Sequence, residues 1–215
     1  MMLELNSDLA AQIEALYRDM EESYDSVATP IGLTCEGCPD NCCDSYFLHH
    51  TYIEWAYLWY GISKLEPAHI QLLKERSAEY EQQACELLKK GVRPQLMCPL
   101  NENGRCTLYH YRLMVCRTHG VPASLTRPDG HRFNFPGCFR AQAIIEQSDD
   151  DKVGEYSMER TELMKRLVLL EQTFTSGSRH VLPKVKMTIA SMVVAGPPMV
   201  KTCLSNSDAL DSNFR

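Results

Sequence analysis

The chain has 215 residues, a formal net charge of -6 and a sequence pI near 5.7, which suits one domain with its own core. The acidic balance excludes a strongly basic surface, so we expect no nucleic-acid partner. No stretch approaches the roughly 20 consecutive apolar residues of a membrane helix, so we expect no membrane association.

The opening segment, residues 1–20, carries acidic side chains where a secretory signal carries positive charge, and it lacks a continuous apolar run. We therefore expect a cytoplasmic protein. The chain holds ten cysteines. Because disulfides persist in oxidising compartments and a reducing cytosol keeps thiols available to metals, metal binding is favoured over disulfides.

The first half of the chain predicts three helices. Apolar residues three or four apart indicate an amphipathic helix over 7–24, and Thr29-Pro30 interrupts the pattern. The aromatic-rich run 46–60 favours a buried helix that ends at the next glycine. Glu66-Pro67 opens a third helix, which runs to a glycine cap at residue 91.

Residues 92–139 contain frequent proline and glycine, which predicts loops and short hairpins. The turn chemistry of 127–130, flanked by Leu125 on one side and by Phe133 and Phe135 on the other, predicts a β-hairpin. Such irregular backbone is expected to bury little apolar surface, so we expect its folding to depend on bound metal.

Two further helices are predicted over 139–147 and 154–175, and 185–194 is expected to dock as a strand or a helix. We expect one helical cysteine-cluster domain over 1–178 and a C-terminal extension over 179–215 whose end is frayed. The predicted fold class is therefore mainly α: a small helical domain with an irregular cysteine-rich metal-binding centre and a short β-hairpin.

The first cysteine cluster comprises Cys35, Cys38, Cys42 and Cys43. Two thiolates separated by two residues can share one metal ion, and Gly37 and Pro39 favour a tight turn that points backbone amides at the sulfurs. Cys42 and Cys43 are adjacent, so we expect their side chains to diverge and one of them to serve a second site.

The second cluster comprises Cys98, Cys106, Cys116 and Cys138. A glycine turn between the first two can bring them to one ion, and the other two would return from a short helix and a hairpin. The eight cysteines divide naturally into two four-coordinate sites. Cys85 and Cys203 are left out, because an isolated cysteine is more often a core residue.

Other polar residues near the cysteines fit supporting roles. His110 and His119 are candidates to hydrogen-bond or orient the ligands rather than to bind metal themselves. Arg105, Arg112 and Arg117 would offset the surplus negative charge of four thiolates on a divalent ion, or are ordinary solvated charges.

The ordered set of motifs resembles the YkgJ-type zinc- or iron-chelating cysteine-cluster family. The similarity covers roughly residues 33–140 and comprises Cys35-x2-Cys38 leading to Cys42-Cys43, then Cys98-Pro99, Gly104-Arg105-Cys106-Thr107-Leu108-Tyr109, Arg112-Leu113-Met114-Val115-Cys116-Arg117, and Cys138. Three residues rather than the commoner two precede Cys42-Cys43, and Leu113 stands where the family usually has proline. The resemblance implies metal chelation and leaves its biological purpose open.

Several functions remain open on sequence. The first is a zinc-binding or iron-binding protein. The second is an iron-sulfur protein, with for example a 4Fe-4S cluster, that acts as a redox protein or enzyme similar to flagellin lysine-N-methylases. The third is a disulfide-stapled protein without metal. A thiol enzyme using Cys116 with His119 is disfavoured, because nearby cysteines would compete for the thiolate. Whether the chain is an enzyme stays open.

Overall fold

The protein is described by a computed structural model over residues 4–35, 42–148 and 155–199. Within these ranges the helices are α1 (Ser7–Ala28), α2 (Tyr52–Ile62), α3 (Pro67–Lys89), α4 (Met114–Thr118), α5 (Phe139–Glu146), α6 (Thr161–Phe174) and α7 (Ile189–Ala195). The strands are β1 (Asn101–Glu102), β2 (Arg105–Cys106), β3 (Ala123–Thr126), β4 (Arg132–Phe135) and β5 (Met158–Glu159). The mainly helical fold class is confirmed.

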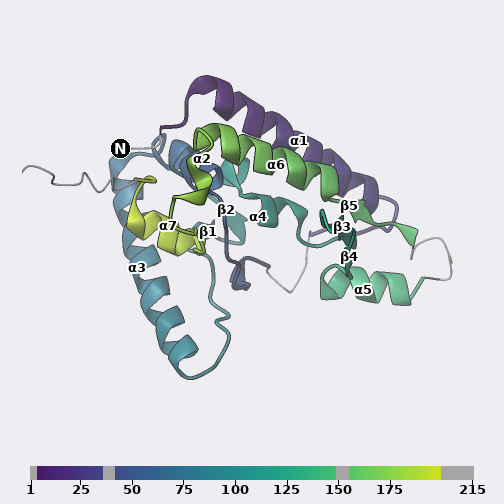
Figure 1. Cartoon of the computed structure of the whole chain (residues 1–215). Coiled ribbons are helices and arrows are strands. Elements are labelled where there is room, and N and C mark those ends of the chain that lie inside the picture. The colour runs from purple at the N-terminus through teal and green to yellow at the C-terminus, as the bar shows by residue number, and fades with distance from the viewer. Residues whose placement is uncertain (1–3, 36–41, 149–154, 200–215) are drawn as a thin grey trace, which may run out of the picture.

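The helices surround a middle region built from the irregular segments between α3 and α5. Helices α1 and α6 lie side by side along one face, and α3 packs against α7 at one end of the molecule (Figure 1). The small sheet, with strand order β4-β3-β5, lies with α5 at the opposite end. Helix α4 contacts α1 and lies between these two ends.

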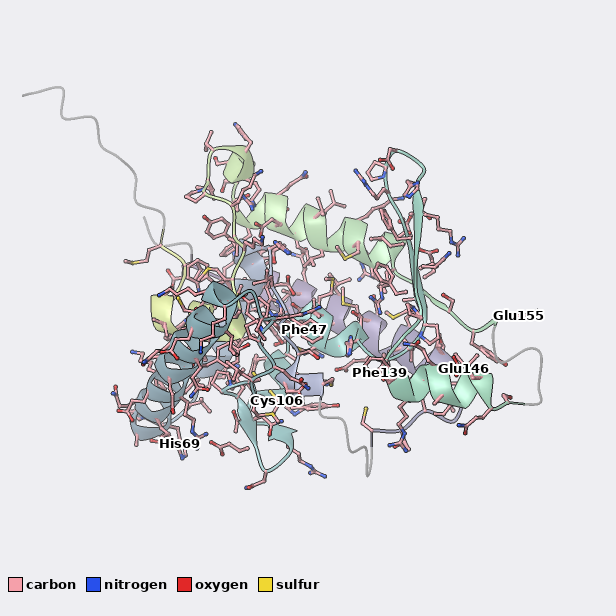
Figure 2. The ribbon with its side chains drawn as sticks, turned by 90° about the horizontal axis from the view of Figure 1, so that it is seen from below. Phe47, His69, Cys106, Phe139, Glu146 and Glu155 are labelled. Carbon is pink, nitrogen blue, oxygen red and sulfur yellow. The ribbon has the colours of Figure 1, made fainter. Side chains whose placement is uncertain are left out.

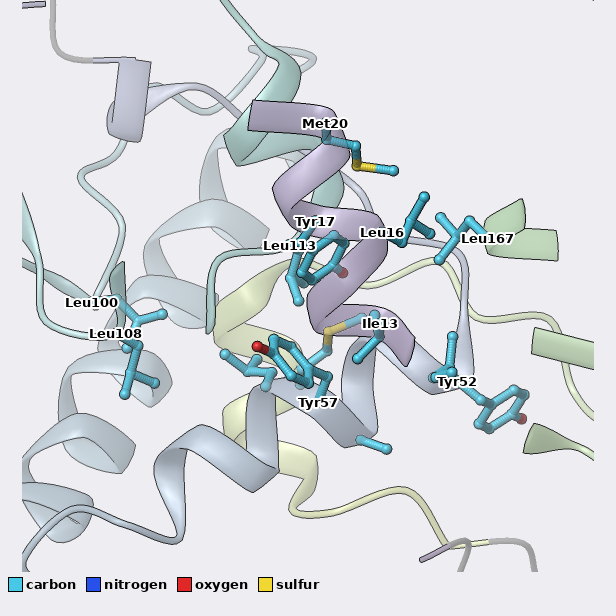
Figure 3. Close-up of a cluster of buried hydrophobic side chains, with 14 of the residues drawn as sticks. Ile13, Leu16, Tyr17, Met20, Tyr52, Tyr57, Leu100, Leu108, Leu113 and Leu167 are labelled. Atoms are coloured by element: carbon cyan, nitrogen blue, oxygen red, sulfur yellow. The ribbon is translucent and has the colours of Figure 1, made fainter. Parts of the chain in front are cut away.

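Helix α1 provides one side of the main core, and the prediction of a helix over 7–24 is confirmed. The side chain of Asn6 caps it by accepting the amide N–H of Leu9 at 2.8 Å. Its apolar stripe is buried against α2, α6 and the middle region (Figure 3). The stripe comprises Leu9, Ile13, Leu16, Tyr17 and Met20. The helix continues to Ala28 and ends just before Thr29-Pro30.

Helix α2 begins at Tyr52, so the predicted start at residue 46 is wrong. Thr51 is its N-cap, and the carboxylate of Glu171 on α6 accepts the amide N–H groups of Tyr52 and Ile53 at 3.0 and 2.9 Å. A carboxylate from a distant helix therefore satisfies N–H groups that have no partner within α2. Because this cap comes from a distant helix, the spacing of aromatic residues in the segment could not predict where α2 begins.

Helix α3 is confirmed, with a glycine-dependent C-terminus. Gly91 has φ +71, and its N–H and that of Val92 donate to the carbonyls of Leu88 and Leu87 at 3.0 Å each. The interpretation of Cys85 as a core residue is wrong, because its side chain is exposed on α3. The buried stripe of this helix runs instead through Leu73, Ser77, Tyr80 and Ala84.

The sheet confirms the predicted hairpin and changes the following helix. Strands β3 and β4 pair antiparallel around the predicted turn, and β5 pairs parallel with β3. The N–H of Met158 donates to the carbonyl of Pro122 at 2.8 Å. Because this pairing holds 158–159 as a strand, α6 begins only at Thr161, and the predicted start at 154 is wrong. Helix α5 follows Cys138 as predicted.

The middle region has more apolar burial than the sequence suggested. Irregular backbone between α3 and α5 places several side chains in the main core, each at most 3% exposed. They are Leu100, Leu108, Leu113, Val121 and Ala123. The expectation that residues 92–139 bury little apolar surface is therefore wrong, and this region has hydrophobic anchors that do not require metal.

The segment predicted as a strand or a helix over 185–194 combines both forms. Met187 makes an antiparallel bridge with His49, and α7 follows directly. The indole N–H groups of Trp55 and Trp59 donate to the carbonyl of Met192 at 3.2 and 2.9 Å, which fixes α7 to α2. Among the described helices, none combines the length and apolar character needed to cross a membrane.

Gly61 offers a direct test of how α2 packs on the middle region. A Cβ atom at this position would lie 2.3 Å from Cγ of Tyr111, far inside van der Waals contact. We expect Gly61→Ala to lower the free energy of unfolding by about 2 kcal/mol, because overpacking outweighs the gain in helix propensity. Urea denaturation measures the change.

The control is the same substitution in a Tyr111→Ala background, where the ring that a Cβ would meet is gone. There Gly61→Ala should stabilise the protein by up to about 1 kcal/mol, as alanine does in an unobstructed helix. Equal effects in the two backgrounds would show that the ring does not pack on Gly61.

We expect His49 to make the stability of the protein sensitive to acid. Its ring is buried, Nδ1 has no hydrogen-bond partner, and burial lowers its pKa to about 4. The unfolded chain binds the proton near pH 6.5, so stability present above that pH is lost as pH falls toward 4. We expect His49→Leu to reduce this loss by about 3 kcal/mol, measured by urea denaturation at pH 7 and pH 4.

The matched control for His49 is the exposed His69→Gln, which should leave the pH dependence unchanged. An unaltered acid response in His49→Leu would mean that other groups cause the destabilisation.

Candidate metal centre

Two cysteine-bearing segments that are far apart in the chain are joined through their backbones. The N–H of Cys98 donates to the carbonyl of Cys43 at 2.9 Å, and Ser45 forms an antiparallel bridge with Gln95. The side-chain amide of Gln95 also donates to Asp44 at 3.1 Å. These contacts fix Cys43 beside Cys98 without any bond between their sulfurs.

A tight hairpin brings the next cysteine to the same place. Strands β1 and β2 are joined by Asn103 and Gly104, which have φ +52 and +83, as the two-residue turn of a hairpin requires. Asn101 pairs with Cys106 in this ladder. Figure 2 labels Cys106 in this hairpin. The glycine turn that the sequence predicted between Cys98 and Cys106 is confirmed.

Backbone amides point at two of the sulfurs. The thiol of Cys98 accepts the N–H of Leu100, and the thiol of Cys106 accepts the N–H of Leu108. Both bonds lower the pKa of the thiol that receives them, against the larger effect of burial. Amide-to-sulfur bonds two residues along the chain stabilise thiolates in metal sites.

Cys116 lies on the short helix α4, which a buried carboxylate holds in place. Oε1 of Glu54 accepts the N–H of Met114 at 2.8 Å and the hydroxyl of Tyr17 at 3.2 Å, while Oε2 accepts the hydroxyl of Thr51 at 2.7 Å. Glu54 is only 2% exposed. The sequence contains the Thr51-x-x-Glu54 pattern of a helix cap, but its further link to α4 could not be predicted from it.

The thiols of Cys43, Cys98, Cys106 and Cys116 form the first thiol group. Burial raises the pKa of Cys98, of Cys106 and of Cys116, the last to about 12. Every pair within the group also interacts electrostatically, and each of these three thiols has its pKa raised further by others of the group. Four thiols from four segments therefore influence one another electrostatically.

Arginine side chains lie beside this group. Arg112 and Arg117 lower the pKa of Cys106, and Arg112 also lowers that of Cys116, in each case against the larger effect of burial. Arg117 is 6% exposed and donates to the carbonyls of Arg112 and His110 at 2.7 and 2.6 Å. It also pairs with Glu21 and stacks over Tyr17. Arg105 is exposed in β2.

The second thiol group comprises Cys35, Cys42 and Cys138, which gather around Tyr24. Burial raises the pKa of Tyr24, and these three thiols raise it further; Cys35 also hydrogen-bonds the phenol. The N–H of Cys138 donates to the carbonyl of Gly120 at 2.8 Å. Figure 2 labels Phe139, which follows Cys138 at the start of α5. Cys38 and Cys203 lie outside the described residues.

Two glycines make the second group possible. A Cβ on Gly120 would lie 2.6 Å from the hydroxyl of Tyr24, and a Cβ on Gly137 would lie 2.6 Å from the carbonyl oxygen of Gly120. Both glycines also have positive φ, +127 and +86. The backbone before Cys138 can approach Tyr24 only because neither position carries a side chain.

The adjacent cysteines link the two groups. We expected the side chains of Cys42 and Cys43 to diverge, but their thiols hydrogen-bond each other, so that expectation is wrong. This bond is the main cause that lowers the pKa of Cys43 to about 6 and raises that of Cys42. Their other electrostatic partners differ in part. Cys42 interacts with Cys35 and also with Cys116, whereas Cys43 interacts with all three other members of the first group.

The chemical state of the cysteines and one buried amide N–H group beside them are consistent with thiolate ligands. All eight cysteines in the described ranges are thiols rather than disulfides. Among the described residues, no three Cys, His, Asp or Glu side chains are close enough together to hold a metal ion. Nδ2 of Asn101 is buried without a hydrogen bond of ordinary geometry, although its proximity lowers the pKa of Cys43. That buried donor fits a thiolate acceptor.

The two histidines proposed as supporting residues have different surroundings. His110 is exposed, and its backbone carbonyl rather than its ring accepts from Arg117. His119 is half-buried with its ring 5.0 Å from that of Phe47. Neither is placed as a ligand. Sequence reasoning missed Tyr24, Glu54 and Asn101, whose contacts here are made across the fold.

The comparisons with known proteins add no relative. No family model, no curated protein and no solved structure matches this chain.

Proposed function

We propose that this protein binds zinc or iron through its clustered cysteine thiolates, at two neighbouring four-cysteine sites. The first site would use Cys43, Cys98, Cys106 and Cys116. The second would use Cys35, Cys42 and Cys138, with Cys38 as its fourth ligand. We also propose that the resemblance to the YkgJ-type family reflects this chemistry.

The observation that carries the proposal is the mutual interaction of four thiols that come from four separate segments. Each pair of the first thiol group acts on the pKa of a member. Backbone amides donate to two of these sulfurs, which is an arrangement that favours thiolate. Isolated core cysteines have no reason to gather in this way.

Electrostatics explains why a cation belongs at the first thiol group. Burial and mutual repulsion raise the pKa of Cys98, Cys106 and Cys116, so forming four thiolates there without a cation is unfavourable. A divalent ion or an iron-sulfur cluster would reverse this repulsion, and the ligands would lose their protons as it binds. The sulfurs would then close upon it, and Arg112 and Arg117 would offset the remaining negative charge.

The two metals imply different roles. Zinc in a closed four-thiolate site is structural, because it has no redox chemistry and no open coordination position. Iron in the same ligands would be an electron carrier, and the amides that donate to sulfur would tune its potential. We propose metal binding and assign no catalysed reaction to these thiols.

The test is elemental analysis of full-length protein purified under anaerobic, reducing conditions. The proposal predicts either a colourless protein with about two zinc ions per chain or a brown protein with iron and acid-labile sulfide. Negligible metal in protein whose thiols are intact would contradict it. Paired cysteines in freshly prepared protein, detected by non-reducing mass spectrometry, would establish a disulfide-stapled protein instead.

A further inference from the structure

A small cavity lies beside α4, and the cysteines of the metal proposal do not line it. It has a volume of about 180 Å³. Its apolar walls include Met114 from α4, Leu125 and Phe135 from the hairpin, and Met164 from α6. Three polar residues, Thr118, His119 and Arg160, also line it. In Figure 1, α6 is seen above α4 and the hairpin to its right.

Arg160 brings a cation to this apolar cavity. Among the described residues its guanidinium donates a hydrogen bond to the carbonyl of Thr118. Nε is buried without a hydrogen-bond partner. The guanidinium lies 5.5 Å from the ring centroid of Phe135, which holds it at the wall. A guanidinium has five N–H donors, so donors remain for an anion.

His119 adds a neutral polar group beside that cation. Burial lowers its pKa, and the charge of Arg160 lowers it further, so the imidazole is uncharged at neutral pH. Its ring is fixed against Phe47 at 5.0 Å. A neutral imidazole can donate one hydrogen bond without adding a second positive charge. The cavity therefore offers one cation, one neutral donor and an apolar wall.

The size and chemistry of the cavity select a ligand class. At about 30 Å³ per water molecule, the volume corresponds to roughly six waters, which is well below the size of drug-binding pockets. A phosphate or nucleotide would leave the apolar walls unmatched and would face a single cation. A carboxylate suits a guanidinium, because the two form paired hydrogen bonds.

We propose that this cavity binds a small organic monocarboxylate with a compact apolar or aromatic body, and that Arg160 holds the carboxylate. The apolar body lies against Met114, Leu125, Phe135 and Met164. Binding does not depend on the proposed metal sites. The cavity and Cys116 share α4, so an occupied cavity lies next to the first thiol group.

The test is titration of the full-length protein with benzoate and 3-methylbutanoate, followed by calorimetry and by ligand-observed NMR. Benzyl alcohol and benzylamine serve as ligands of similar shape without the carboxylate. We expect saturable binding of the carboxylates with a Kd in the millimolar range or tighter, and at least about tenfold weaker binding of the other two. Metal-loaded and metal-stripped protein should both bind, which separates this result from the metal proposal.

Variants then assign the carboxylate to Arg160. Arg160→Gln should weaken benzoate binding at least about tenfold. The control Arg166→Gln changes an arginine on α6, the helix that Arg160 precedes as N-cap. Arg166 pairs with Asp19 at 2.5 Å, and the variant should bind benzoate as the wild type does. If Arg160→Gln does not fold, Leu125→Trp is the second test. The larger side chain would fill the cavity from the hairpin and should block benzoate binding.

Three results would overturn the proposal: no saturable benzoate binding below about 20 mM, equal affinity for benzoate and benzyl alcohol, or full benzoate affinity in Leu125→Trp.

Discussion

Replacing Cys106 by serine is expected to remove about half of the metal bound to the protein. Cys106 belongs to the first thiol group, and three thiolates with a weakly binding hydroxyl cannot hold zinc or a cluster as four thiolates do. The second group, around Tyr24, should keep its metal. Metal and protein content measured on the same sample gives the ratio.

Pairs of variants test how the ligands are divided. Cys98→Ser added to Cys106→Ser should cause little further loss, because both cysteines serve the same site. Cys138→Ser added to Cys106→Ser should remove nearly all the metal, because it destroys the other site. Cys85→Ser, in an exposed position on α3, is the control and should retain the full content. Metal loss that simply adds across all pairs would contradict two separate sites.

The helical fold should survive the loss of metal. Leu100, Leu108 and Leu113 anchor the middle region in the main core independently of the thiols. We therefore expect the Cys106→Ser variant to keep its far-ultraviolet circular dichroism.

Removing the carboxylate of Glu54 is expected to have the largest effect on stability. In Glu54→Leu the hydroxyls of Tyr17 and Thr51 and the N–H of Met114 would lose their buried acceptor. Each unsatisfied buried donor costs about 1–3 kcal/mol, so the free energy of unfolding should fall by roughly 3–5 kcal/mol. Urea denaturation at neutral pH measures this change.

Glu54→Gln separates hydrogen bonding from charge. Burial raises the pKa of Glu54, so the charge itself is unfavourable there. The carbonyl oxygen of glutamine can still accept from Met114 and Tyr17, so a loss of only about 1 kcal/mol is expected. Equal losses for leucine and glutamine would show that the carboxylate charge, not its acceptor geometry, stabilises the fold.

Glu54→Leu should also weaken metal binding at the first thiol group, because Glu54 holds α4. Met114 begins the helix that carries Cys116, so releasing its N–H leaves that thiol less well positioned. We expect Glu54→Leu to weaken metal binding at the first site about 10- to 100-fold, as measured by competition with a chelator. Glu54→Gln should retain wild-type affinity, which distinguishes positioning from a general loss of stability.

The sequence alone predicted those elements that depend on interactions between residues close together in the chain. The apolar stripe of α1, Pro67 and Gly91 at the two ends of α3, and the turn between β3 and β4 were all predictable. Each depends on interactions within a few residues, namely helical periodicity, a fixed backbone angle or a turn hydrogen bond. The glycine turn between Cys98 and Cys106 belongs to the same class.

Only the tertiary structure decided which residues meet. The start of α2 depends on Glu171, the start of α6 depends on pairing between β3 and β5, and the first thiol group depends on the bond from Cys98 to Cys43. None of these partners is close in the chain. Spacing identified the cysteines, but long-range packing set their neighbours, since burial and cross-chain hydrogen bonds depend on how the segments fold together.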